Sequence, residues 1–175
     1  IVFAAGNVHL DCDGEPSVTC INSNQANSTV GAVDHNLLPQ PYSSRGPGFC
    51  SPYHPLVAAP THGVLPWWGG WIDTGSLGAG TSSTAPQVAA ALAVLRSAFP
   101  LATNVELRAS LAASAVDSGG RATTGWGPTL GYGLLRVDKA LEILPSIKDH
   151  PFYGQLKAAA ERTLVADVIA QQVKG

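Results

Sequence analysis

Residues 80–90 read Gly-Thr-Ser-Ser-Thr-Ala-Pro-Gln-Val-Ala-Ala, a run of small residues that continues into a helical pattern. Apolar side chains then recur at helical spacing as far as Pro100, which predicts a helix over about residues 84–99. Pro86 suits the first turn of that helix, because its missing N–H would have no partner there. Ser82, just before the helix, has two interpretations. It could be an N-cap, or a nucleophile whose developing charge faces backbone N–H groups at the start of the helix.

A second apolar run opens the chain and leads to an amide side chain. Residues 1–5 read Ile-Val-Phe-Ala-Ala, which is typical of a buried parallel strand, and Gly6 and Asn7 follow it. Open α/β sheets bind ligands at the carboxyl ends of their strands, where the Asn7 amide could donate a hydrogen bond to an oxyanion. The alternative is that Asn7 only turns the chain, since Asn adopts turn geometry readily.

The rest of the chain predicts one α/β domain. With 175 residues, of which 45% are hydrophobic, the chain can bury a substantial core. Further β-rich runs at residues 29–34 and 56–60 indicate a mainly parallel sheet with long connections. Residues 61–79, rich in glycine and tryptophan, read as a loop. Later helices are predicted from Thr103 or Asn104 as cap to about residue 117, over residues 134–141, and over residues 154–173.

The residues around Ser82 resemble a known motif. Gly-Thr-Ser-x-x-Ala-Pro-x-Val-Ala is similar to the nucleophile motif of the subtilisin-like serine peptidases (subtilases), with Ser82 at the nucleophile position. Ser83 and Gln87 stand where Met and His are common in that motif. The Ala-Ala-Gly-Asn segment resembles the one that carries the oxyanion-hole asparagine of the family, which implies that role for Asn7. Other similar segments follow in the order of the family, at residues 29–34, 42–47, 57–64, 107–117 and 131–137, with Thr61 and His62 inserted before the glycine of an Ala-Pro-Gly strand end.

The resemblance covers residues 1–143, which it implies to be the C-terminal part of a subtilase-like catalytic domain. The implied fold is α/β, a three-layer α/β/α subtilisin-like arrangement with a mainly parallel sheet. Residues 144–175 lie outside the resemblance and are expected to form a helical extension packed on the same domain. The implied activity is that of a serine endopeptidase on peptide or protein substrates. Ser82 would attack the scissile carbonyl, while Asn7 and the Ser82 N–H would bind the oxyanion.

The catalytic Asp and His of the family both precede the strand that opens this chain. We therefore expect residues 1–175 to be the later part of a longer polypeptide, with the Asp and His supplied by a preceding fragment or chain. Without them, the 175 residues should be inert. His62 could replace the missing base only if it lay within hydrogen-bond reach of Ser82. Two other functions stay open: a peptide transferase or macrocyclase, in which an amine takes the acyl group, and an inactive binding or scaffold protein that keeps the fold.

Composition excludes some partners. A net charge of −2 and a charged fraction of 13% leave no basic face for a nucleic acid. No apolar run reaches the length needed to span a membrane, and a secreted or extracytoplasmic location is favoured. No cofactor is expected in this segment, with calcium as the possible exception. Residues 11–15 gather three carboxylates beside a glycine and resemble half a calcium loop, although a solvated turn is the alternative.

The cysteines and tryptophans also leave alternatives open. Cys12 and Cys20 bracket a short loop and could form a disulfide, with Cys50 as the expected spare. A Cys12–Cys50 bridge fits the sequence equally well, as do three reduced thiols in an intracellular protein. The three tryptophans of the 61–79 segment could either form the rim of a peptide groove or cover a hydrophobic loop; they are Trp67, Trp68 and Trp71.

Overall fold

The computed structural model describes residues 1–9, 17–19, 21–22, 24, 26–61, 64–67, 70–73 and 80–172, with the backbone alone for residues 64–67, 70–73 and 163–172. Its main sheet has three parallel strands in the order β1 (Val2–Ala4), β2 (Ser28–Val33) and β3 (Val57–Pro60). The central strand β2 is buried at every residue, as expected for a strand with neighbours on both sides. All three strands coincide with the apolar runs that predicted them, although β2 begins one residue earlier, at Ser28.

Residues 132–135 continue the sheet beyond β3. The Ala58 N–H donates to Gly133 O at 2.9 Å, and the Leu135 N–H donates to Ala58 O at 2.9 Å. Leu134 also pairs with Val116 from the other side. Because these residues belong to the sheet, helix α3 (Val137–Ile143) begins later than the predicted helix over residues 134–141. The pairing of Val116 likewise explains why α2 (Asn104–Ser114) ends before residue 117.

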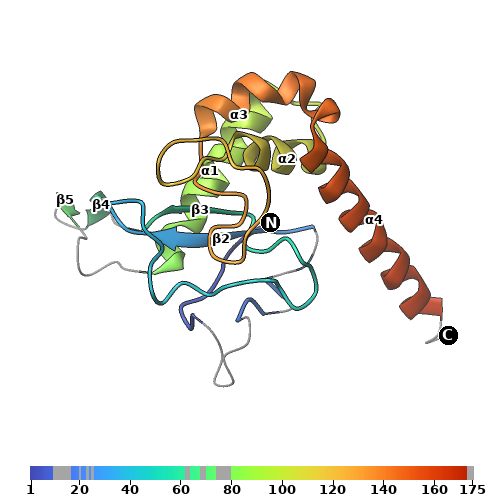
Figure 1. Ribbon diagram of the computed structural model, residues 1–175, viewed down its shortest axis with the longest axis horizontal. Helices are drawn as coiled ribbons and strands as arrows, with labels where there is room; N and C mark the ends of the chain where they lie inside the picture. The colour runs from blue at the N-terminus through green and yellow to red at the C-terminus, as the bar shows by residue number, and fades with distance from the viewer. Residues whose placement is uncertain are drawn as a thin grey trace.

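In Figure 1, α2 and α3 lie above the strands, α1 (Ala85–Ala98) crosses the sheet, and α4 (Pro151–Gln172) runs away from it toward the lower right. Helix α1 contacts all three strands, and α2 packs against α1, α3 and α4. A 3₁₀ helix that the sequence pattern did not predict, η2 (Leu144–Asp149), lies between α3 and α4. Helix α4 begins at Pro151, three residues before the predicted start. None of the helices in the described part of the chain is long and apolar enough to cross a membrane.

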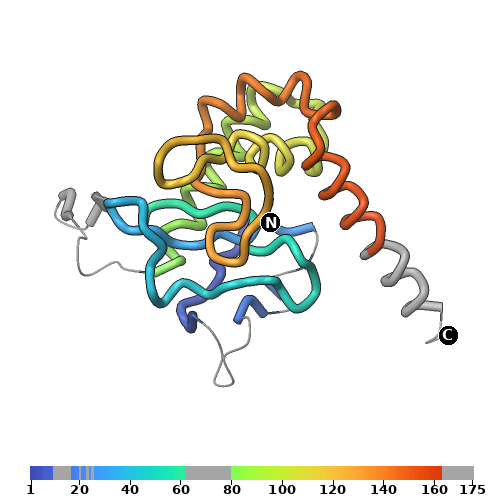
Figure 2. The backbone as a smooth tube through the Cα atoms, in the orientation of Figure 1, coloured from blue at the N-terminus to red at the C-terminus, as the bar shows by residue number. Residues whose placement is uncertain are grey.

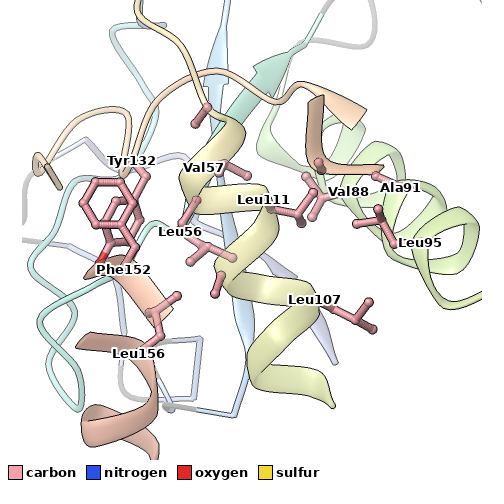
Figure 3. Packing of buried hydrophobic residues seen from close by; sticks show 14 of the residues in the cluster. Leu56, Val57, Val88, Ala91, Leu95, Leu107, Leu111, Tyr132, Phe152 and Leu156 are labelled. Atoms are coloured by element: carbon pink, nitrogen blue, oxygen red, sulfur yellow. The ribbon is translucent and has the colours of Figure 1, made fainter. Parts of the chain in front are cut away.

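The core lies on both sides of α2. Leu107 and Leu111 point from α2 toward α1 in Figure 3, while Leu56, Tyr132 and Phe152 lie on the other side. The rings of Tyr132 and Phe152 have their centroids 4.6 Å apart. Through Phe152 and its neighbours, the beginning of α4 is part of the same core as the sheet; the buried residues there are Phe152, Leu156 and Ala159.

The segment predicted as a loop contains a hairpin instead. Strands β4 (Val64–Trp67) and β5 (Gly70–Asp73) pair antiparallel, with Trp67 opposite Gly70. The two runs are rich in apolar and aromatic residues and are separated by two residues that include a glycine, a spacing typical of hairpins. Trp68 and the tryptophan side chains lie outside the described residues, so their role stays a prediction.

The disulfide expectation needs a correction. Cys50 is disulfide-bonded and is therefore not the spare cysteine. Cys12 and Cys20 lie outside the described residues. Spacing along the chain favoured a local bridge between these two, but the fold brings segments together that are far apart in sequence. The β2–β3 connection that carries Cys50 passes below the strands in the view of Figure 2.

Candidate active site

Ser82 lies in a short 3₁₀ turn, η1 (Thr81–Ser83), directly before α1. The residue is exposed, and its hydroxyl makes no hydrogen bond with any described residue. The N-cap of α1 is Thr84, a buried residue whose own hydroxyl donates to Thr81 O at 2.8 Å. The N-cap interpretation of Ser82 is therefore wrong. The Ser82 hydroxyl has no structural role among the described residues.

Asn7 follows β1 in a tight turn supported by Ser44. Gly6 has a φ of +111°, and an added Cβ would lie 2.7 Å from Ser44 Oγ, so only glycine fits there. The Ser44 N–H donates to Gly6 O at 2.9 Å, and Ser44 Oγ accepts from the Val8 N–H at 3.3 Å. Ser44 thus holds the residues on both sides of Asn7 and leaves the Asn7 side chain exposed.

Thr81 joins the two turns. Asn7 Oδ1 accepts hydrogen bonds from the Thr81 N–H and from the Thr81 hydroxyl, both at 2.9 Å. Thr81 Oγ1 in turn accepts from the Gly6 N–H at 3.1 Å. Because Oδ1 has two donors, the amide orientation is defined, and Nδ2 faces away from Thr81.

Two nitrogen donors lie next to the same small space beside Gly80. A Cβ added at Gly80 would lie 3.2 Å from Asn7 Nδ2 and 3.8 Å from the Ser82 nitrogen. Neither group donates a hydrogen bond to a described residue. Two unpaired donors that converge beside an exposed serine hydroxyl can bind an oxygen atom that acquires negative charge.

Residues at the end of β3 make hydrogen bonds with the turn that contains Ser82. The Thr61 hydroxyl donates to Gly80 O and accepts from the Gly80 N–H, both at 2.9 Å. Gln87 Nε2 donates to Pro60 O at 2.6 Å and to Ser83 O at 2.9 Å. Sequence reasoning missed the parts that Thr61 and Thr81 play, although the position of Thr61 directly after a strand was a usable signal.

No histidine in the described part of the chain makes a hydrogen bond with Ser82. His54 is fully buried before β3, at the opposite end of the strand from Thr61. Burial, with a smaller contribution from the positive charge of Arg108, lowers the pKa of His54 to about 3. His62 lies outside the described residues, so its suggested role as a base stays a prediction.

Metal binding has no support from the described residues. Among them, no three His, Cys, Asp or Glu side chains gather to hold an ion. Residues 11–15, with their predicted half calcium loop, lie outside the described part of the chain, and calcium binding there stays a prediction.

The fold and this site define a class of protein: an α/β domain in which a serine and an asparagine meet at the carboxyl ends of parallel strands. A family model described as the subtilase family matches residues 1–133. The chain therefore belongs to the subtilase family of serine peptidases. Comparison with curated proteins finds no match.

Solved structures share the fold. The self-cleaved protease domain of PatA matches with a TM-score of 0.57 and 23% identity, over 82% of this chain and 49% of the other. Fervidolysin from Fervidobacterium pennivorans, a keratinolytic enzyme related to subtilisin, matches with a TM-score of 0.53 and 26% identity, over 81% of this chain and 22% of the other. The predicted α/β subtilisin-like fold is confirmed, and the chain spans about half of the first relative and about a fifth of the second.

Proposed function

We propose that this chain is the nucleophile-bearing part of a subtilisin-like serine endopeptidase. The observation that carries the proposal is the exposed Ser82 hydroxyl beside two donors that bond to no described residue, Asn7 Nδ2 and the Ser82 N–H. Ser82 Oγ attacks the carbonyl carbon of a peptide bond and gives its proton to a base. The carbonyl oxygen becomes an oxyanion that accepts hydrogen bonds from both donors. The base then protonates the leaving amine, and water hydrolyses the acyl-enzyme.

We infer that the base, a histidine oriented by an aspartate, comes from a preceding fragment or chain. Support comes from the face where such a segment would pack. Strand β1 pairs only with β2 among the described residues, so one of its edges is open. Next to it, α1 exposes four apolar residues, Ala89, Ala90, Ala93 and Val94.

A cavity beside the open edge of β1 is further support for a preceding segment that packs there. It has a volume of about 270 Å³ and lies between the start of β1 and helices α1 and α2. Ile1 and Leu92 are among its apolar lining residues, and Ile1 is 85% exposed. Exposed apolar surface at a sheet edge is typical of an interface, and a further strand there would cover it.

We also propose that the protein works outside the cytoplasm. The support is the disulfide at Cys50, because disulfides persist in oxidising compartments and are rare in the cytosol.

Cleavage by the natural full-length protein tests the proposed function. The measurement is the mass of products from an unfolded protein substrate. Ser82→Ala should abolish cleavage, while Ser83→Ala, one residue away, should keep it. Asn7→Asp retains an acceptor for Thr81 but replaces the donor, so the rate should fall about 10²- to 10³-fold.

Three outcomes would contradict the proposal. Cleavage that persists in Ser82→Ala would show that Ser82 is not the nucleophile. Products joined to an amine rather than carrying a new carboxylate would indicate a transferase. Cleavage by residues 1–175 alone would contradict a base supplied from outside the chain.

A further inference from the structure

The Thr61 hydroxyl makes all the hydrogen bonds that a hydroxyl can make, next to the turn that contains Ser82. Thr61 is 1% exposed and follows the last residue of β3. Its single proton goes to Gly80 O, and its oxygen accepts from the Gly80 N–H and from the Tyr42 hydroxyl, at 2.9 and 3.0 Å. One donated and two accepted bonds are the full capacity of a hydroxyl group. Tyr42 therefore determines which way the Thr61 proton points.

These bonds act on the residue that lies between the two proposed oxyanion donors. Thr61 holds both the N–H and the C=O of Gly80, and Asn7 Oδ1 holds the next N–H, that of Thr81. The following N–H belongs to Ser82 and is one of the two donors. The position of that donor relative to Asn7 Nδ2 thus depends on how Gly80 is held.

A second tie supports the same role for the end of β3. The Gln87 amide bridges Pro60 O and Ser83 O, so residues 60 and 61 are connected to the turn on both sides of Ser82. The two ties are a property of this chain's own side chains.

We propose that Thr61, oriented by Tyr42, is a positioning residue for acyl transfer at Ser82. This inference rests on the proposed function, because it concerns the same oxyanion site. The Thr61 hydroxyl fixes Gly80 and thereby keeps the Ser82 N–H aimed at the point that Asn7 Nδ2 also reaches. Preorganised donors act mainly on the transition state, so a loss of alignment should affect kcat rather than substrate binding.

The test compares variants of the natural full-length protein by peptide-hydrolysis kinetics and by the rate of labelling with a fluorophosphonate. Thr61→Val keeps the shape of the side chain and removes the hydroxyl. We expect kcat and the labelling rate to fall about 10- to 100-fold, with KM nearly unchanged. Thr61→Ser, which restores a hydroxyl, should recover most of the rate. Tyr42→Phe should give a smaller decrease of the same kind.

Thr123→Val is the matched structural control. The Thr123 hydroxyl donates to Tyr132 O in a loop away from the turn, so its loss should lower the melting temperature without changing kcat. If Thr61→Val keeps the wild-type kcat below its melting temperature, the inference is wrong. If Thr61→Val does not fold, an unchanged kcat in Tyr42→Phe overturns the inference in the same way. A wild-type protein without labelling at Ser82 would instead contradict the proposed function.

Discussion

At the scale of single residues, Thr81 brings Asn7 and Ser82 together. Its N–H and hydroxyl both donate to Asn7 Oδ1, and Ser82 is the next residue in the chain. Asn7 and Ser82 could be named as candidate site residues from the sequence because each stands in a recognisable local pattern. Thr61 and Thr81 could not, because their importance comes from contacts between residues up to 75 positions apart.

Gly80 should tolerate no side chain if the space beside it holds the oxyanion. Its backbone is extended, with φ 167° and ψ 155°, so Gly80→Ala should fold without backbone strain, with a small shift of the Asn7 side chain. The new methyl group would lie 3.2 Å from Asn7 Nδ2 and fill the space between the donors. We expect kcat for peptide hydrolysis to fall about 10²-fold, comparable to the loss of one oxyanion donor.

Gly125→Ala is the matched control for that substitution, because a Cβ there meets nothing within 4 Å. It should keep the wild-type kcat. An unchanged kcat in Gly80→Ala as well would show that the oxyanion lies elsewhere.

At the scale of elements, apolar runs and capping residues predicted most of the strands and helices. The failures occur where a distant partner decides the local structure. Leu134 looks like the start of a helix, but it pairs with Ala58 and Val116 in the sheet. Cys50 was expected to be unpaired because Cys12 and Cys20 are close in sequence, but Cys50 is disulfide-bonded.

The N-terminus of α2 provides a stability prediction. The Thr103 side chain accepts from the Glu106 N–H at 3.2 Å, and the Glu106 carboxylate accepts from the Thr103 N–H and pairs with Lys148. Thr103→Ala removes one side of this capping box and should lower the free energy of unfolding by about 1 kcal/mol. Urea denaturation measures the change, and kcat should stay the same. A stability equal to wild type would show that the cap contributes nothing.

At the scale of the whole molecule, the buried His54 makes stability depend on pH. Neither ring nitrogen has a hydrogen-bond partner among the described residues, and burial lowers the pKa to about 3 from an ordinary value of 6.5. The unfolded chain therefore binds a proton below pH 6.5 that the folded chain excludes. Stability should be highest above pH 6.5 and decrease as the pH falls toward 3, by about 2 kcal/mol between pH 7 and pH 5.

Urea denaturation of the wild type and His54→Leu at these two pH values measures that contribution. The variant should lose this part of the pH dependence, while the contributions of the other histidines cancel in the comparison. Equal pH dependence in the two proteins would mean that His54 is protonated in the folded state or is not the group responsible.

We propose that Ser82 is a nucleophile that becomes activated within an assembled subtilase domain. The most direct measurement is labelling of the natural full-length protein with a fluorophosphonate, followed by mass mapping of the modified peptide that contains both Ser82 and Ser83. We expect a single label on Ser82, present in Ser83→Ala and absent in Ser82→Ala. A label on Ser83, or no label on a folded protein that contains the histidine-bearing segment, would contradict it.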